Sequence, residues 1–461
     1  MLRKVVTVFS SFVLVASGFA GTAANAEPVR EEVGAEVADG GYFLTSTLAL
    51  TENVGGFYRD GVYCQSLGDT PDCPIVKPGV LIQTTLIAPA CGEFAENCVD
   101  GISITSAGEK VLGEYIANID GRTVKANKSV RLPHGSTSSI WRVPGVKHQG
   151  GADLYLVTVR LETGGSQEGK RPKFFVNTFH SVITPISMTS GDSCQIRTDS
   201  NCYQENNFNP EHLVELRIRV ENTVQGWFGG RLKSTDIAIA KAGGNQSLYT
   251  ISGYPVEVAT FNERLPYNQA SQEIKEDIEK WCPKDQTSCV ALGLNGYGTN
   301  GHILNLERWR KMTNDSASGV AVRWAIRSIQ NSQGSFCSSS AKSKVLGVVS
   351  TNATVFDGGS PKFARGSLNY VVAGMHYLPG GEQKVLGTYD LVMDSSYARC
   401  LYRLGKVPVS ATVSVTGTGD KTIATTVVGE SKGWLKLAAY GYTFSKKTIK
   451  VKITKAKKKS R

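Results

Sequence analysis

The ten cysteines are the residues whose spacing most directly suggests chemistry. Eight of them form four pairs with six to eight residues between the partners, namely Cys64/Cys73, Cys91/Cys98, Cys194/Cys202 and Cys282/Cys289. The other two, Cys337 and Cys400, are far apart in the chain. An even number of cysteines in an exported chain predicts disulfide bonds. Structural zinc is the alternative, but paired zinc ligands usually have only about two to four residues between them.

Basic side chains at the end of the chain form a second set. Residues 403–461 contain 14 Lys and Arg but only two acids, whereas the whole chain has a formal charge of +11. On an exported protein, such a segment favours an anionic cell-wall polymer or a membrane surface as partner. A solvated edge that only keeps the protein soluble is the alternative. The candidate binding residues are Lys446, Lys447, Lys450, Lys452, Lys455, Lys457, Lys458, Lys459 and Arg461.

Three patterns are incomplete versions of catalytic or cofactor motifs. Gly296–Gly301 matches G-x-G-x-x-G but lacks the βαβ surroundings of a dinucleotide site. Gly191–Ser193 is like the nucleophile region of a serine protease, yet Cys194 follows where that family has glycine. Asp390 and Asp394 share one face of a predicted strand, about 13 Å apart, which is too far for a glycosidase pair. We therefore assign no catalytic residue and expect no cofactor.

Histidines and tryptophans leave weaker options. None of the six histidines lies in an H-x-H or H-E-x-x-H pattern, so no metal site is predicted. His376, next to Tyr377, is the histidine of most interest. Trp141, Trp227 and Trp434 lie near Gly or Pro and could stack on a sugar ring, which makes a glycan an alternative partner. Core packing is the simpler interpretation of each. Basic residues are not interleaved with aromatic ones, so nucleic acid is not expected as a partner.

Residues 1–26 have the features of a signal peptide. Arg3 and Lys4 precede an apolar segment, Val5–Ala20, and small residues follow at Ala24–Ala26. We expect cleavage after Ala26 and a mature protein that is secreted or lies at the cell surface. Neither the apolar run nor any later stretch has the length that a membrane-spanning helix requires.

The remaining chain predicts an all-β protein. Alternating or continuous apolar runs at Val80–Ala88, Leu154–Leu161 and Val345–Met393 indicate strands. Residues 268–281 form a single amphipathic helix, with Asn268 or Ser271 as its cap. We expect several stacked β-sandwich, Ig-like domains and one short helix. The predicted units are 27–165, 166–265, a helix and Gly/Asn-rich connector at 266–319, 320–405, and a basic C-terminal β domain with its tail at 406–461.

The last unit shows where the lysines should lie. Four strands are predicted in it, and the final one, Thr448–Thr454, alternates apolar side chains with lysines. Lysines along an edge strand protect a sheet against edge-to-edge association. This pattern therefore also has a structural interpretation that involves no ligand.

Several short segments resemble a group of uncharacterised exported β-rich proteins of actinobacteria. They are Thr351–Val355, Gly387–Leu391 and Ala398–Tyr402, then the segment from Gly433 to Val451, and in addition Trp227–Leu232. The resemblance covers about the C-terminal half. It implies export and disulfide bonding but no known activity, so it identifies no functional residue.

Together these features predict an exported, disulfide-bonded, non-enzymatic protein of the cell surface or cell wall. Its basic C-terminus would hold it on anionic polymers. The alternative is a secreted carbohydrate-active hydrolase or glycan-binding module whose site is built from separate strands. Length and pattern do not determine its oligomeric state.

Overall fold

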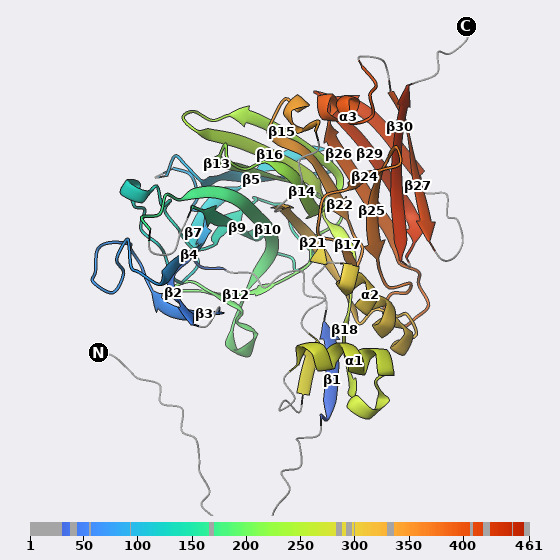
Figure 1. Ribbon diagram of the computed structural model, residues 1–461, viewed down its shortest axis with the longest axis horizontal. Helices are drawn as coiled ribbons and strands as arrows, with labels where there is room; N and C mark the ends of the chain where they lie inside the picture. The colour runs from blue at the N-terminus through green and yellow to red at the C-terminus, as the bar shows by residue number, and fades with distance from the viewer. Residues whose placement is uncertain are drawn as a thin grey trace, which may run out of the picture.

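The computed structural model describes residues 30–36, 44–54, 57–92, 94–165, 170–282, 288–291, 297–298, 300–329, 336–405, 409–417, 425–444 and 446–455. Strands dominate these residues, and the helices are short (Figure 1). The all-β fold class is therefore confirmed.

One large sheet extends through the whole molecule and contains 16 of the described strands. Its main path is β28 (Thr425–Ser431), β29 (Trp434–Thr443), β26 (Leu386–Asp394), β22 (Val345–Thr351), β14 (Gly226–Arg231), β21 (Gly319–Ser328), β10 (Phe175–Thr189), β9 (Leu154–Gly164), β4 (Val80–Ile87), β2 (Thr47–Val54) and β3 (Phe57–Tyr63). Pairing with this path are β7 (Glu114–Asn118), β8 (Ser139–Arg142), β11 (Ile196–Arg197), β12 (Cys202–Glu205) and β17 (Val256–Thr260).

Three smaller sheets accompany the large one. The first contains β15 (Lys233–Lys241), β16 (Gln246–Tyr254), β13 (Leu213–Glu221), β5 (Cys98–Ser106) and β6 (Glu109–Leu112). The second contains β20 (Tyr297–Gly298), β23 (Val355–Asp357), β25 (Ser367–Ala373), β30 (Lys447–Lys455), β27 (Val409–Gly417) and β24 (Lys362–Ala364). The third contains β18 (Asn262–Pro266), β1 (Glu32–Glu36) and β19 (Ser288–Ala291).

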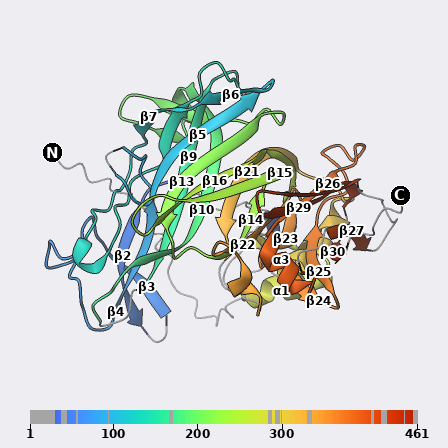
Figure 2. The ribbon, with the colours of Figure 1, turned by 90° about the horizontal axis from the view of Figure 1, so that it is seen from above.

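Two hydrophobic cores lie on opposite faces of the large sheet. Val348 and Val392 belong to the core shared with the β5–β13–β16 sheet. Their neighbours Val349 and Leu391 belong to the core shared with the β25–β30–β27 sheet. Side chains alternate between faces along a strand, so β22 and β26 are buried on both sides. Figure 2 shows the two parts, one N-terminal and one C-terminal, joined through these central strands.

Strand β14 differs from the sequence-based expectation. The pattern predicted a turn at residues 226–231, but all six residues are buried in a strand between β21 and β22. Gly229 and Gly230 made a turn plausible. In the structure, a Cβ on Gly230 would lie 2.6 Å from the Ala325 carbonyl oxygen. Glycine is present here because the neighbouring strand approaches closely.

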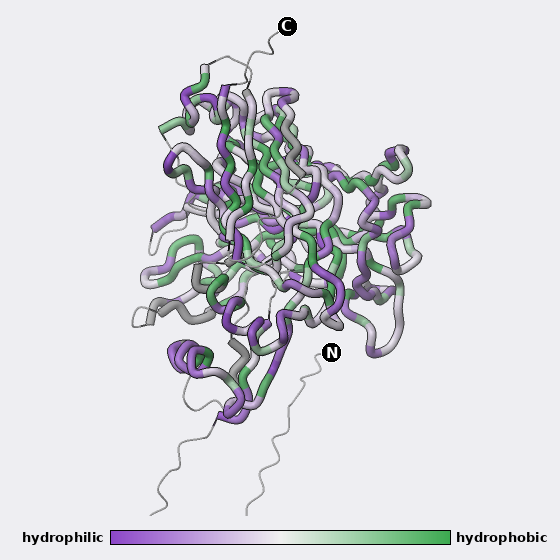
Figure 3. Tube along the Cα trace, turned by 90° about the vertical axis from the view of Figure 1, so that its right-hand side faces the viewer, coloured by the Kyte–Doolittle hydropathy of each residue, from purple (hydrophilic) through white to green (hydrophobic). Residues whose placement is uncertain are grey.

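The described residues contain three α-helices where one was predicted. Helix α1 (Gln272–Trp281) confirms the prediction, and the Ser271 side chain accepts a hydrogen bond from the Ile274 N–H at its start. In Figure 3 this charged helix is a hydrophilic coil below the sheets. The others are α2 (Asn300–Trp309) and α3 (Ser395–Leu401). The sequence pattern did not predict α3, whose first turn is capped by the Asp394 side chain. No described helix is long and apolar enough to span a membrane.

Four strands form in the C-terminal segment, as predicted, but they enter two different sheets. Strands β28 and β29 extend the large sheet next to β26. Strands β27 and β30 join β25 in the sheet on the other side of the core. Every predicted β unit contributes strands to the large sheet. The Ig-like character of the layers remains a prediction.

Candidate functional site

The predicted lysines occupy a central strand. Strand β30 pairs with β25 on one side and β27 on the other, so it is not an edge strand, and the edge-protection interpretation is wrong. Lys446, Lys450, Lys452 and Lys455 are exposed, whereas Lys447 is 4% exposed. The predicted Lys457, Lys458, Lys459 and Arg461 lie outside the described residues.

The outward side of this sheet is polar. Lys450 is paired in register with Asn369 of β25 and Ser414 of β27, and Lys452 is paired with Thr412. We call these five residues the lysine face. Ile449, Val451 and Ile453 point the opposite way into the core. This alternation explains why the lysines are held outward, at roughly 6–7 Å spacing along the strand.

Four of the predicted cysteine pairs lie at disulfide distance. Their Cα–Cα separations are 5.9 Å for Cys64–Cys73, 5.1 Å for Cys91–Cys98, 5.5 Å for Cys194–Cys202 and 5.7 Å for Cys337–Cys400. These distances suit disulfide bonds. The side chain of Cys289, predicted to pair with Cys282, is outside the described part of the structure.

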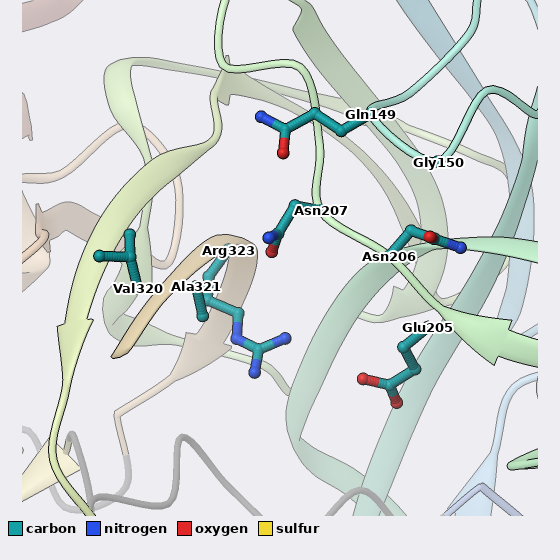
Figure 4. A pocket seen from close by; sticks show the side chains of 8 residues that line it. All are labelled: Gln149, Gly150, Glu205, Asn206, Asn207, Val320, Ala321 and Arg323. Carbon is teal, nitrogen blue, oxygen red and sulfur yellow. The ribbon is translucent and has the colours of Figure 1, made fainter. Parts of the chain in front are cut away.

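A polar pocket of about 460 Å³ lies between three segments of the chain (Figure 4). The segments are the loop after β8, the end of β12 with the two residues that follow it, and the first half of β21. The lining residues are Gln149, Gly150, Glu205, Asn206, Asn207, Val320, Ala321 and Arg323. Sequence reasoning assigned none of them, because nothing in the local pattern indicates that these segments meet.

Hydrogen bonds hold the three segments of this pocket together. The Gln149 N–H donates to the Asn207 carbonyl oxygen at 3.2 Å, and the Asn206 N–H donates to the Pro185 carbonyl oxygen at 2.8 Å. The Val322 N–H donates to Asn207 Oδ1 at 3.1 Å, which fixes that side chain against β21.

His148 lies beside the pocket and is hydrogen-bonded to Gly150, one of its lining residues. Its Nδ1 accepts the Gly150 N–H at 3.0 Å, and its Nε2 lies 3.0 Å from the Ile186 carbonyl oxygen, so the ring is neutral with the proton on Nε2. Burial lowers the pKa of His148 and favours this form. A Cβ on Gly150 would lie 2.3 Å from Asn206 Oδ1, so the loop requires glycine there.

A second cluster of polar side chains spans the neighbouring strands β9, β10 and β21 of the large sheet. His180 of β10 is paired in register with Arg160 of β9 and Arg327 of β21, beside a cavity of about 220 Å³. Burial, together with the two neighbouring arginines, lowers the pKa of His180 to about 3. Glu162 accepts hydrogen bonds from Arg160 and Thr178.

His376 contacts a carboxylate. Its Nδ1 is hydrogen-bonded to Asp315, and Arg310 Nε lies 3.8 Å from the same carboxylate. Among the described residues, no hydroxyl or thiol is hydrogen-bonded to the other ring nitrogen of His376. Asp315 therefore orients the His376 ring as a carboxylate orients a general base, but no nucleophile among the described residues is bonded to that ring. The described residues also contain no group of three or more His, Cys, Asp or Glu suited to a metal ion.

Asp390 and Asp394 have separate roles. Asp394 caps α3 through the N–H groups of Ser396 and Tyr397. Asp390 is 5% exposed and accepts a hydrogen bond from Tyr440 Oη at 2.8 Å, where β15 packs against the large sheet. Burial raises the pKa of Asp390 to about 7, although the Tyr440 hydrogen bond opposes this shift.

The three tryptophans considered for sugar stacking are buried. Trp141 is 6% exposed, Trp227 is 1% exposed and Trp434 is 7% exposed. Each belongs to one of the two cores. The proposed stacking role is therefore wrong for all three. The glycine pattern at 296–301 falls partly outside the described residues.

No protein-family model matches the chain, and no curated protein matches it. The resemblance to exported actinobacterial proteins stays a prediction, and the function must be inferred from the geometry.

Proposed function

We propose that this is an exported, disulfide-bonded, non-enzymatic protein held on an anionic cell-surface polymer by its lysine face. The observation that supports this most directly is the arrangement of Lys450 and Lys452. Both are exposed on the same side of β30, and their register partners in β25 and β27 are Asn369, Ser414 and Thr412. No acidic partner neutralises them within this face.

A repeating polymer suits this surface better than a small anion. Lys450 and Lys452 project from the same side of one strand, whereas a single phosphate or carboxylate is usually bound in a concave site. Hydroxyl and amide groups beside the lysines can donate hydrogen bonds to the same polymer. The attraction is electrostatic, so it decreases as salt is added.

The test compares salt-dependent binding of the full chain and its variants to an immobilised poly(glycerol phosphate). We expect Lys450→Gln/Lys452→Gln to lower affinity by about tenfold or more at low salt, since a lysine near an anionic surface contributes on the order of 1 kcal/mol. A matched control, Lys128→Gln/Lys241→Gln, removes two exposed lysines elsewhere with the same change in net charge. Equal losses in both double variants would show that only net charge matters and would contradict the proposal.

Two further measurements separate other partners and other lysines. Binding to phosphatidylglycerol vesicles but not to the polymer would favour a membrane surface instead. A chain that ends at Thr454 lacks Lys455 and the six residues after it. If this truncation abolishes binding while the Lys450→Gln/Lys452→Gln variant keeps it, the tail and not the lysine face is the binding element.

The hydrolase alternative has less structural support. Glycoside hydrolysis uses two carboxylates about 5–10 Å apart. The polar pocket contains one, Glu205, and the cavity beside His180 contains one, Glu162. A third cavity, of about 840 Å³, is lined by Lys342, Lys344 and neutral residues. We therefore do not propose a hydrolytic function.

A further inference from the structure

We propose that the polar pocket between β12, β21 and the loop after β8 binds one neutral sugar unit of a glycan. This site is separate from the lysine face and uses different chemistry. It rests on four side chains, Gln149, Glu205, Asn207 and Arg323, whose placement in one pocket is shown in Figure 4.

The first reason is that charged groups face the pocket without a protein partner. In Figure 4 the Arg323 guanidinium and the Glu205 carboxylate point toward each other across the pocket. No salt bridge joins these two side chains, and neither has a side-chain hydrogen bond to another described residue. Arg323 is only half-exposed, so its guanidinium gains from a ligand that accepts its hydrogen bonds.

The second reason is the balance of donors and acceptors. Arg323 supplies only donors, Glu205 supplies only acceptors, and the Gln149 amide supplies both. Asn207 Oδ1 is already occupied by the Val322 N–H, so its Nδ2 group remains as a donor. A sugar hydroxyl both donates and accepts, and neighbouring hydroxyls match the paired atoms of a guanidinium, carboxylate or amide. One positive and one negative charge cancel, which suits a neutral ligand.

The third reason is size and rigidity. A volume of about 460 Å³ lies within the range of small-molecule sites and accommodates a sugar ring with its hydroxyl groups. The backbone hydrogen bonds from Gln149, Asn206 and Val322 form the walls in advance, which lowers the entropic cost of binding. Val320 and Ala321 of β21 also line the pocket. A free amino acid would engage the two charged groups but would leave the amides largely unused.

The experiment measures binding of methyl glycosides of neutral hexoses and pentoses to the full chain by ligand-observed NMR and calorimetry. We expect at least one of these glycosides to bind in the millimolar range. Glu205→Gln and Arg323→Gln should each weaken that binding at least tenfold, or about 1.4 kcal/mol. Because neither side chain has a hydrogen bond or an ion pair with another described residue, the melting temperature should stay close to that of the parent protein.

Matched controls are Glu211→Gln and Arg171→Gln, which change exposed side chains of the same types outside the pocket. They should leave sugar binding unchanged, and so should Lys450→Gln/Lys452→Gln, which tests the lysine face separately. Absence of binding by every glycoside would overturn the proposal. Binding that survives both pocket substitutions would overturn it as well. If glycine binds instead of the sugars, and Glu205→Gln abolishes that binding, then the pocket takes a zwitterion and the proposal of a sugar ligand is wrong.

Discussion

At the scale of single residues, burial decides which ionisable groups matter. Asp390 and the exposed Asp120 have the same side chain, but only Asp390 lies between two packed sheets. Water cannot solvate its charge there, so the neutral form is favoured and its pKa rises from 3.8 to about 7. The hydrogen bond from Tyr440 and the backbone N–H groups of Ser234 and Thr235 offset only part of this cost.

This shift predicts a pH-dependent stability. The folded state holds the Asp390 proton more tightly than the unfolded state, so the stability from this group is complete below about pH 4 and is lost as the pH rises through about 7. Asp390→Asn keeps a group that can accept from Tyr440 but does not titrate. The free energy of unfolding of the variant should therefore rise relative to that of the parent between about pH 4 and about pH 7, by up to ~1.4 kcal/mol per unit of pKa shift.

Urea unfolding at several pH values measures this difference. The control is Asp120→Asn, which makes the same substitution at an exposed position. If the free energy of unfolding of Asp390→Asn depends on pH in the same way as that of the parent protein, then Asp390 is solvated in the native state and the prediction is wrong.

At the scale of elements, covalent and noncovalent links connect distant strands. The Cys337–Cys400 pair has a sequence separation of 63 residues and connects α3 to the segment before β22. The Cys64–Cys73 pair has a separation of 9 residues and closes only a local loop. A bond that closes a longer loop restricts the unfolded chain more strongly.

Removing the two bonds should therefore have unequal effects. We expect Cys337→Ser/Cys400→Ser to lower the free energy of unfolding by about 4 kcal/mol and Cys64→Ser/Cys73→Ser by about 3 kcal/mol. Guanidinium unfolding under non-reducing conditions measures both values, and the short-loop variant is the matched control. A larger loss in the short-loop variant would contradict the chain-entropy explanation.

At the scale of the whole molecule, the large sheet unites segments that the sequence pattern separates. Strand β29 completes one side of β26, and β30 completes one side of β25, so residues after 406 contribute to both layers of the C-terminal core. A truncation before these strands should therefore expose an apolar face of the C-terminal core.

Truncation tests this interdependence. A chain that ends at Gly405 lacks β27, β28, β29 and β30 and should expose the core faces of β25 and β26. We expect it to aggregate or to lose its cooperative thermal transition and near-ultraviolet circular dichroism. A chain ending at Thr454 keeps nearly all of these strands and should unfold like the full chain. A stable, cooperative product ending at Gly405 would show instead that 406–461 is an independent domain.

The sequence by itself determined the features that depend on neighbours in the chain. Alternation predicted strands such as β9 and β30, and the Ser271 cap with its apolar spacing predicted α1. These patterns are local because side-chain direction repeats every two residues in a strand and about every 3.6 in a helix. Cysteine proximity likewise indicated three short-range pairs that the structure places at disulfide distance.

Only the tertiary structure decided which strands meet. The same local pattern suits an edge strand and a central one, so the position of β30 between β25 and β27 depends on distant partners. The polar pocket joins residues near 150, 206 and 322, and the burial of Asp390 depends on β15. Contacts between segments so far apart follow from how whole layers bury their apolar faces, which no local pattern specifies.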